Sequence, residues 1–167
     1  MRTSLSVREA FENDIPVIQQ LAKETWPTAY GELLSPEQLA YMLNMMYSTE
    51  SLRKQMADGH RFYIAETGEK ILGFASVSDE GEHTFKLNKL YILPNIQRSG
   101  AGSALLDTCI SFAKEHQGRR LILQVNRQNP ARHFYEKHGF SILEEIDLHV
   151  GNGFYMNDYV MELLITN

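Results

Sequence analysis

The most specific signal in this chain is a short glycine-containing segment, Gln97-Arg98-Ser99-Gly100-Ala101-Gly102-Ser103. It follows a predicted strand at residues 84–93 and opens a long predicted helix that ends near residue 117. The amides at a helix start lack helical partners and are directed toward an anion. Gly100 and Gly102 allow the backbone to approach a phosphate closely, and Arg98 adds a positive charge. Taken alone, the segment fits an anion site and a plain glycine turn equally well.

Two nucleotide-binding motifs match this segment poorly. A P-loop has a lysine and then serine or threonine after its last glycine, whereas Gly102 is followed by Ser103-Ala104. A dinucleotide-binding loop has a third glycine where this chain has Leu105, and it belongs to the first strand–helix–strand unit of a fold. A nucleotide-binding protein stays open as an alternative, which saturable ATP binding with magnesium would favour.

Hydrophobic patterns divide the whole chain into short elements with short connections. Strands are predicted at residues 4–10, 61–66, 70–78, 84–93, 121–125, 141–150 and 154–165. Helices are predicted at 15–26, 35–46, 49–57, from the glycine segment to 117, and at 129–139. Pro27 and Gly31 should end the first helix, and Ser35-Pro36-Glu37-Gln38 should form a capping box for the second. This order predicts an α/β domain, residues 1–167, with a mixed sheet covered by helices on both faces.

Composition excludes several classes of protein. A formal net charge of −5 argues against non-specific binding of nucleic acid, and it suits either a cationic substrate or simple solubility. The single cysteine, Cys109, permits no intramolecular disulfide and falls in an apolar helical pattern, which predicts a buried thiol. No His/Cys cluster has metal-ligand spacing, so no metal is expected. Without an apolar run of about 18 residues or a signal peptide, we expect no membrane association and a cytoplasmic protein.

Two separated segments together carry a family resemblance. The first is Leu90-Tyr91-Ile92-Leu93-Pro94, followed by the glycine segment and a helix. The second, further along, is Asn129-Pro130-Ala131-Arg132-His133-Phe134-Tyr135-Glu136-Lys137-His138-Gly139-Phe140. In this order they resemble the coenzyme A motifs of the GCN5-related N-acetyltransferases, the GNAT family. The resemblance covers essentially the whole chain and implies a mostly antiparallel seven-stranded sheet and an acetyl-CoA-dependent enzyme without a metal.

The resemblance implies a role for each matching residue. The backbone of Leu90, Tyr91 and Ile92 would pair with the pantetheine arm and the acetyl group, and an amide near Ile92 would stabilise the oxyanion. The pyrophosphate would be held by Gln97, Arg98, Ser99, Gly100, Ala101, Gly102 and Ser103. Asn129 would contact coenzyme A and also cap its helix. Tyr135 would protonate the thiolate that leaves, because a tyrosine with a pKa near 10 is protonated at neutral pH. Phe134 is better explained by packing.

The chain departs from the family pattern at the general base. Many relatives have a glutamate on the strand before the loop, whereas this strand reads Lys86-Leu87-Asn88-Lys89-Leu90 and contains no carboxylate. Asn88 could position a water but could not take a proton. A lysine-like amine has a pKa of about 10.4, so its deprotonation at pH 7 costs roughly 4–5 kcal/mol. Glu24 and Glu32 are the alternative candidates. Gln97 and Arg98 also replace the usual arginine and glycine, with little effect expected because the donors are backbone amides.

The acceptor is expected to be a small amine. In the segment Glu24-Thr25-Trp26-Pro27-Thr28-Ala29-Tyr30-Gly31-Glu32, aromatic side chains alternate with acids, which suits an extended cation. Tyr30 and Glu32 are the candidate substrate-binding residues, and Trp26 is expected in the core. The chain also resembles bacterial spermidine/spermine N-acetyltransferases at Glu24-Thr25, Ser35-Pro36-Glu37, residues 48–52, 153–156 and 158–161, which makes a polyamine the first substrate to test.

Three further possibilities stay open at this stage. A protein N-acetyltransferase would have a flat, open acceptor surface rather than a closed pocket. A regulatory module would bind acetyl-CoA without turnover, as the missing strand glutamate would allow. The family resemblance also allows a homodimer, although no residue of the sequence identifies an interface.

Overall fold

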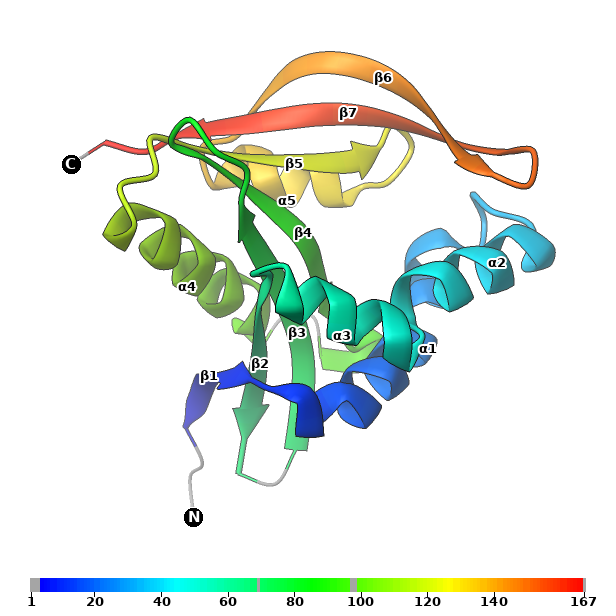
Figure 1. The fold of residues 1–167 in the computed structure, drawn as a ribbon, viewed down its shortest axis with the longest axis horizontal. Coiled ribbons are helices and arrows are strands. Elements are labelled where there is room, and N and C mark those ends of the chain that lie inside the picture. Colours follow the sequence, from blue (N-terminus) through cyan, green and yellow to red (C-terminus); the bar gives the residue numbers. More distant parts are fainter. Residues whose placement is uncertain (1–3, 69, 97–98, 167) are drawn as a thin grey trace.

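The computed structural model describes residues 4–68, 70–96 and 99–166, which form a single seven-stranded sheet with helices on both faces (Figure 1). The strand order is β1-β2-β3-β4-β5-β7-β6, and every neighbouring pair is antiparallel except β4 and β5. This arrangement confirms the predicted mixed, mostly antiparallel sheet. The strands are β1 (Leu5–Ala10), β2 (Arg61–Thr67), β3 (Lys70–Asp79), β4 (Thr84–Ile92), β5 (Arg120–Asn126), β6 (Ser141–Gly151) and β7 (Phe154–Leu164).

In the part of the chain that the structure describes, five α-helices and two short 3-10 helices connect these strands. The helices are α1 (Ile15–Tyr30), α2 (Pro36–Tyr47), α3 (Thr49–Ala57), α4 (Ala101–Glu115) and α5 (Ala131–Lys137), with η1 (Glu12–Asp14) and η2 (Pro94–Ile96). Helix α4 is the crossover between the parallel strands β4 and β5, which cannot be joined by a tight turn. Within the described residues, no helix has the length and apolarity needed to cross a membrane.

Two hydrophobic cores lie on opposite faces of the sheet. Alternate residues of β2 separate them: Phe62 and Ile64 pack with helices α1 to α3, whereas Tyr63 and Ala65 pack with α4. This alternation follows from the two-residue period of a strand. Trp26 is only 1% exposed and belongs to the first of these cores, as the sequence predicted.

Helix α1 does not end at Pro27, contrary to the expectation from the sequence. It continues to Tyr30, and the amide of Gly31 still donates to the carbonyl of Pro27 at 2.8 Å. Proline removes one helical hydrogen bond, but the buried side chains of Trp26 and Tyr30 anchor the last turn on both sides of it. As a consequence, the helix carries Tyr30 one turn further, toward β4.

The start of α2 is capped as predicted, but only half of the capping box forms. Ser35 Oγ accepts a hydrogen bond from the backbone amide of Gln38 at 3.1 Å. The Gln38 side chain does not turn back to its own helix. It donates to the carbonyl of Tyr155 at 3.1 Å, which connects α2 to β7.

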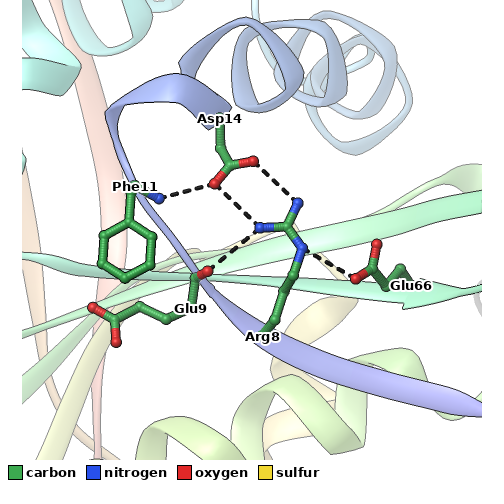
Figure 2. A network of polar contacts seen from close by, with 5 residues as sticks. All are labelled: Arg8, Glu9, Phe11, Asp14 and Glu66. Atoms are coloured by element: carbon green, nitrogen blue, oxygen red, sulfur yellow. Dashed lines mark hydrogen bonds and ion pairs between the residues drawn. The ribbon is translucent and has the colours of Figure 1, made fainter.

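Arg8 on β1 fixes the start of the first helix against the sheet (Figure 2). Its guanidinium donates to both oxygens of Asp14, at 3.0 and 3.1 Å, and to Glu66 on β2 at 3.0 Å. Asp14 also accepts from the amide of Phe11 at 2.9 Å. The hydrogen bond from Arg8 is the largest cause of the lowered pKa of Asp14. A planar guanidinium can make this two-oxygen contact, which a lysine cannot reproduce.

Candidate active site

The site begins where two neighbouring strands separate. Strands β4 and β5 are paired only between Thr84–Leu87 and Arg120–Leu123, and beyond these residues a cavity of about 420 Å³ opens between them. It reaches α5 and the start of α4 on one face of the sheet and α1 on the other. The lining comprises Thr25, Ala29, Tyr30, Leu87, Asn88, Lys89, Leu90, Tyr91, Ile92, Gly102, Leu123, Gln124, Val125, Asn129, Pro130, Ala131, Phe134 and Tyr135.

A β-bulge lies at the point where the strands separate. The register with β3 shifts between the pairs Ser76–Lys89 and Val77–Leu87, so Asn88 is the extra residue. A bulge interrupts the ladder and re-aims the residues that follow. The Asn88 side chain donates to Ser78 Oγ at 2.9 Å, so its amide is already engaged beside the cavity.

The predicted anion site lies at the start of helix α4. Gly100 has a φ of 88°, in the left-handed region, and directly precedes the helix. The amide of Ala101 donates to Ser99 Oγ at 3.3 Å, whereas the next amides, of Gly102 and Ser103, lie in the first turn, where a helix supplies no acceptors. Two further predicted residues, Gln97 and Arg98, lie outside the described residues.

A side-chain contact joins the start of α4 to helix α5. Nδ1 of His138 lies 2.9 Å from the carbonyl of Phe134, which can only accept, so the proton of a neutral imidazole resides on Nδ1. Its Nε2 then accepts a hydrogen bond from the Ser103 hydroxyl at 3.1 Å. Ser103 therefore offers its backbone amide, rather than a free hydroxyl, to an anion.

The other residues that the sequence predicted to bind coenzyme A also lie at the cavity. Leu90, Tyr91 and Ile92 on β4 all line it, and so does Asn129. Asn129 Oδ1 accepts from the amide of Ala131 at 2.9 Å, but the cap position of α5 is Pro130, one residue later than the sequence predicted. Helix α5 itself is counted from Ala131.

Tyr135 reaches the cavity from helix α5. Tyr135 is only 8% exposed, and burial raises the pKa of its hydroxyl well above the ordinary value of tyrosine. The hydroxyl consequently stays protonated at any physiological pH. It can donate a proton or a hydrogen bond, and it can accept a proton only after it has given up its own.

Helix α1 forms the opposite wall of the cavity. Tyr30 lines it, and its hydroxyl lies 2.7 Å from the hydroxyl of Tyr91. Burial raises the pKa of Tyr30 to about 12. Glu24 and Glu32, the carboxylates considered as bases, are both exposed and lie outside the lining, because they project from the outer side of α1 and from the turn after it.

Two buried charged residues close to this cavity lie in segments quoted in the sequence analysis, but neither was assigned a role of its own. Lys89, which is 5% exposed, lines the cavity and donates to Gln55 at 2.7 Å. Burial lowers the pKa of Lys89 to about 8. In the sequence Lys89 follows Lys86 and Asn88 in the same strand, so its charge alone does not mark it as buried.

Asp158 on β7 is the second of these residues. It is 4% exposed, and burial raises its pKa to about 6. Within the described part of the chain, its Oδ1 has no hydrogen-bond partner. The same part of the chain contains no group of three or more His, Cys, Asp or Glu side chains placed to hold a metal ion.

Comparisons with known proteins agree on one family. The family described as "Acetyltransferase (GNAT) domain" matches residues 32–163. The chain is 29% identical to an uncharacterized N-acetyltransferase of Mycobacterium tuberculosis over 150 residues, which cover 89% of this chain and 96% of that protein. It is 25% identical to a spermidine N(1)-acetyltransferase of Thermoplasma acidophilum over 159 residues, covering 92% and 96%.

Two further proteins extend the comparison. The chain is 31% identical to a ribosomal protein bS18-alanine N-acetyltransferase of Haemophilus influenzae over 122 residues, covering 71% and 77%. Its fold is similar to the crystal structure of the PaiA N-acetyltransferase of Thermoplasma acidophilum in complex with coenzyme A. The TM-score is 0.83 at 23% identity, with 97% and 99% of the two chains covered.

Proposed function

The chain belongs to the GNAT family of acetyl-CoA-dependent N-acetyltransferases, and from this premise we propose that it acetylates a primary amine of a small polyamine such as spermidine or spermine. The observation that carries the proposal is the cavity between β4 and β5, which extends from Gly102 at the start of α4 to Tyr30 on α1. A donor and an acceptor could therefore enter from opposite faces of the sheet and meet where the strands separate.

The donor side suits a long molecule with a pyrophosphate. The amides of Gly102 and Ser103 lie in the first turn of α4, where the helix dipole adds a partial positive charge. The backbone of Leu90, Tyr91 and Ile92 lies on the β4 segment beyond the last pair with β5, so it can pair with an extended arm. Asn129 lies on the far wall of the same cavity.

The reaction requires no protein nucleophile. The neutral amine attacks the thioester carbon, the backbone amide near Ile92 stabilises the oxyanion, and Tyr135 gives its proton to the sulfur as the C–S bond breaks. Cys109 is fully buried in the core beneath α4, and burial raises the pKa of its thiol to about 12. A thiol in that environment is an inert packing group.

Several features favour a small cationic acceptor. The chain carries a net charge of −5, and the rings of Tyr30 on α1 and Tyr91 on β4, which are in edge contact, both line the cavity. The likeness to a spermidine acetyltransferase extends over almost the whole chain. The likeness to a protein-alanine acetyltransferase supports a protein acceptor as the alternative, over a shorter part of the chain.

Release of free thiol from acetyl-CoA tests the proposal. The panel comprises spermidine, spermine, simple diamines, aminoglycosides and short peptides that begin with alanine. We expect the fastest release with spermidine or spermine. Fast release with the peptides alone would overturn the polyamine assignment in favour of a protein acceptor. Calorimetric binding of acetyl-CoA without release for any amine would instead support a regulatory module.

A further inference from the structure

A buried carboxylate lies on the acceptor side of the sheet, and the mechanism above does not use it. On β7, Tyr159, Met161 and Leu163 pack into the core beneath α4. Since side chains of a strand alternate between faces, Asp158 points to the opposite face, where α1 lies. The face that holds Asp158 is therefore the face from which an acceptor would enter.

The strand pairing places Asp158 beside the cavity. It lies opposite Asn126 on β5, which directly follows the cavity-lining residues Gln124 and Val125. The charge of Asp158 also contributes, after burial, to the raised pKa of Tyr30. Because Tyr30 lines the cavity from α1, the carboxylate acts on that wall of the cavity through space.

The cationic side chains that the structure describes around Asp158 do not form a hydrogen bond with its Oδ1. Arg127 donates from Nη2 to the carbonyl of Ile146 at 2.9 Å and to Asp147 at 2.8 Å, and from Nε to the backbone carbonyl of Asp158 at 3.4 Å, so none of these contacts reaches the Asp158 carboxylate. The charges of Arg127 and Lys86 lower the pKa of Asp158, but burial outweighs both. Among the residues that the structure describes, no donor reaches Oδ1. A buried carboxylate oxygen without a donor is expensive to keep, which suggests a donor that comes from outside the chain.

We infer that Asp158 binds the ammonium group of the acceptor and takes its proton, an inference that rests on the proposed amine acetylation. An ammonium supplies both the positive charge and the N–H donor that Oδ1 lacks. Like Asp158, the other carboxylates considered, Glu24 and Glu32, are not among the lining residues, but both are exposed, whereas Asp158 is buried behind the acceptor side of the cavity. Lys89 lines the cavity, but its positive charge would repel the same ammonium.

The step balances as follows. The ammonium gives one proton to Asp158, and the nitrogen lone pair forms the C–N bond with the acetyl carbon. The C–S bond breaks, its electron pair stays on sulfur, and the thiolate takes the proton of Tyr135. The second proton of the nitrogen restores the Tyr135 hydroxyl, and Asp158 releases its proton to solvent. The net products are the acetamide, free coenzyme A and one proton.

The test compares Asp158→Asn with Asp147→Asn, a matched control. Asp147 is an exposed carboxylate on the neighbouring strand β6 that pairs with the same Arg127, so its loss changes the net charge equally. For wild type, kcat/KM for the amine should rise as the pH increases through about 6, because Asp158 must be ionised to accept a proton. Asp158→Asn should lower kcat/KM at pH 8 by about 100-fold or more and abolish this rise. Asp147→Asn should match wild type.

A second readout separates the possible failures. Acetyl-CoA affinity, measured by calorimetry, should be the same for all three proteins, since Asp158 lies on the opposite face from the α4 start. An Asp158→Asn protein with the wild-type rate and pH profile would overturn the role of Asp158 and leave the proposed function intact. A wild-type protein that acetylates no amine would overturn both.

Discussion

Tyr135 lies on the wall of the cavity and is protonated whenever the protein is folded, because burial raises its pKa. Tyr135→Phe removes only the hydroxyl and keeps the ring that packs against Phe134 and Phe140. We expect kcat to fall by about 10²–10³-fold while the calorimetric affinity for acetyl-CoA stays unchanged. Full turnover with normal affinity would show that another group protonates the thiolate.

At the same scale, the polar residues of the site were predictable from the sequence only in part. Tyr135 could be predicted because its neighbours form a contiguous motif. The position of Asp158 beside the cavity could not be predicted, because it depends on the pairing of Asp158 with Asn126 on β5, which the linear sequence does not show. Glu24 and Glu32 are close to Trp26 and Tyr30 in the sequence, yet Glu24 lies on the exposed side of α1 and Glu32 in the exposed turn that follows it.

Among the elements, the start of α4 combines a glycine in the left-handed region with the candidate anion site. Gly100→Ala places a side chain at a φ of 88°, which should cost about 1–2 kcal/mol of stability. It should also shift the amides that follow and weaken acetyl-CoA binding. Gly59→Ala is the control, because Gly59 has a φ of 100° and no atom near an added Cβ.

Urea unfolding measures the stability that each variant loses, and calorimetry measures its affinity for acetyl-CoA, so the two effects can be separated. Both variants should lose similar stability, and only Gly100→Ala should lose affinity. An equal loss of affinity in the two would mean that general destabilisation, rather than the shape of this turn, controls binding.

The elements themselves were largely predictable, since alternating and helical patterns reflect the two buried faces of the sheet. The end of α1 was not predictable. Pro27 favours a helix end locally, but the burial of Trp26 and Tyr30 depends on strands that come later in the chain. The bulge at Asn88 was equally hidden, because it is defined by the register with β3.

For the whole molecule, Asp158 should make stability depend on pH. Its pKa in the folded protein is about 6, raised from 3.8, so between these values the folded state binds more protons than the unfolded state. Its favourable contribution is complete below pH 3.8 and is lost as the pH rises through 6. The difference is about 2–3 kcal/mol at most.

Asparagine at position 158 cannot ionise, so the Asp158→Asn protein should not lose this stability as the pH rises. The free energy of unfolding in urea, measured at pH 5 and pH 8, should therefore decrease less for Asp158→Asn than for wild type. Asp147→Asn again provides the control. Identical decreases in all three proteins would indicate that Asp158 ionises as freely in the folded state as in the unfolded one.

The short pairing of β4 with β5 has a consequence for how the molecule is held together. Only four residue pairs join the strands that precede α4 to those that follow it, so the sheet consists of two halves with a narrow seam. Beyond the seam, the edge of β4 presents backbone groups that its neighbour leaves unmatched. An extended donor lying along that edge would act as a removable eighth strand. Acetyl-CoA would then be a structural element of the sheet as well as a substrate, and this edge of β4 would be paired only while acetyl-CoA is bound.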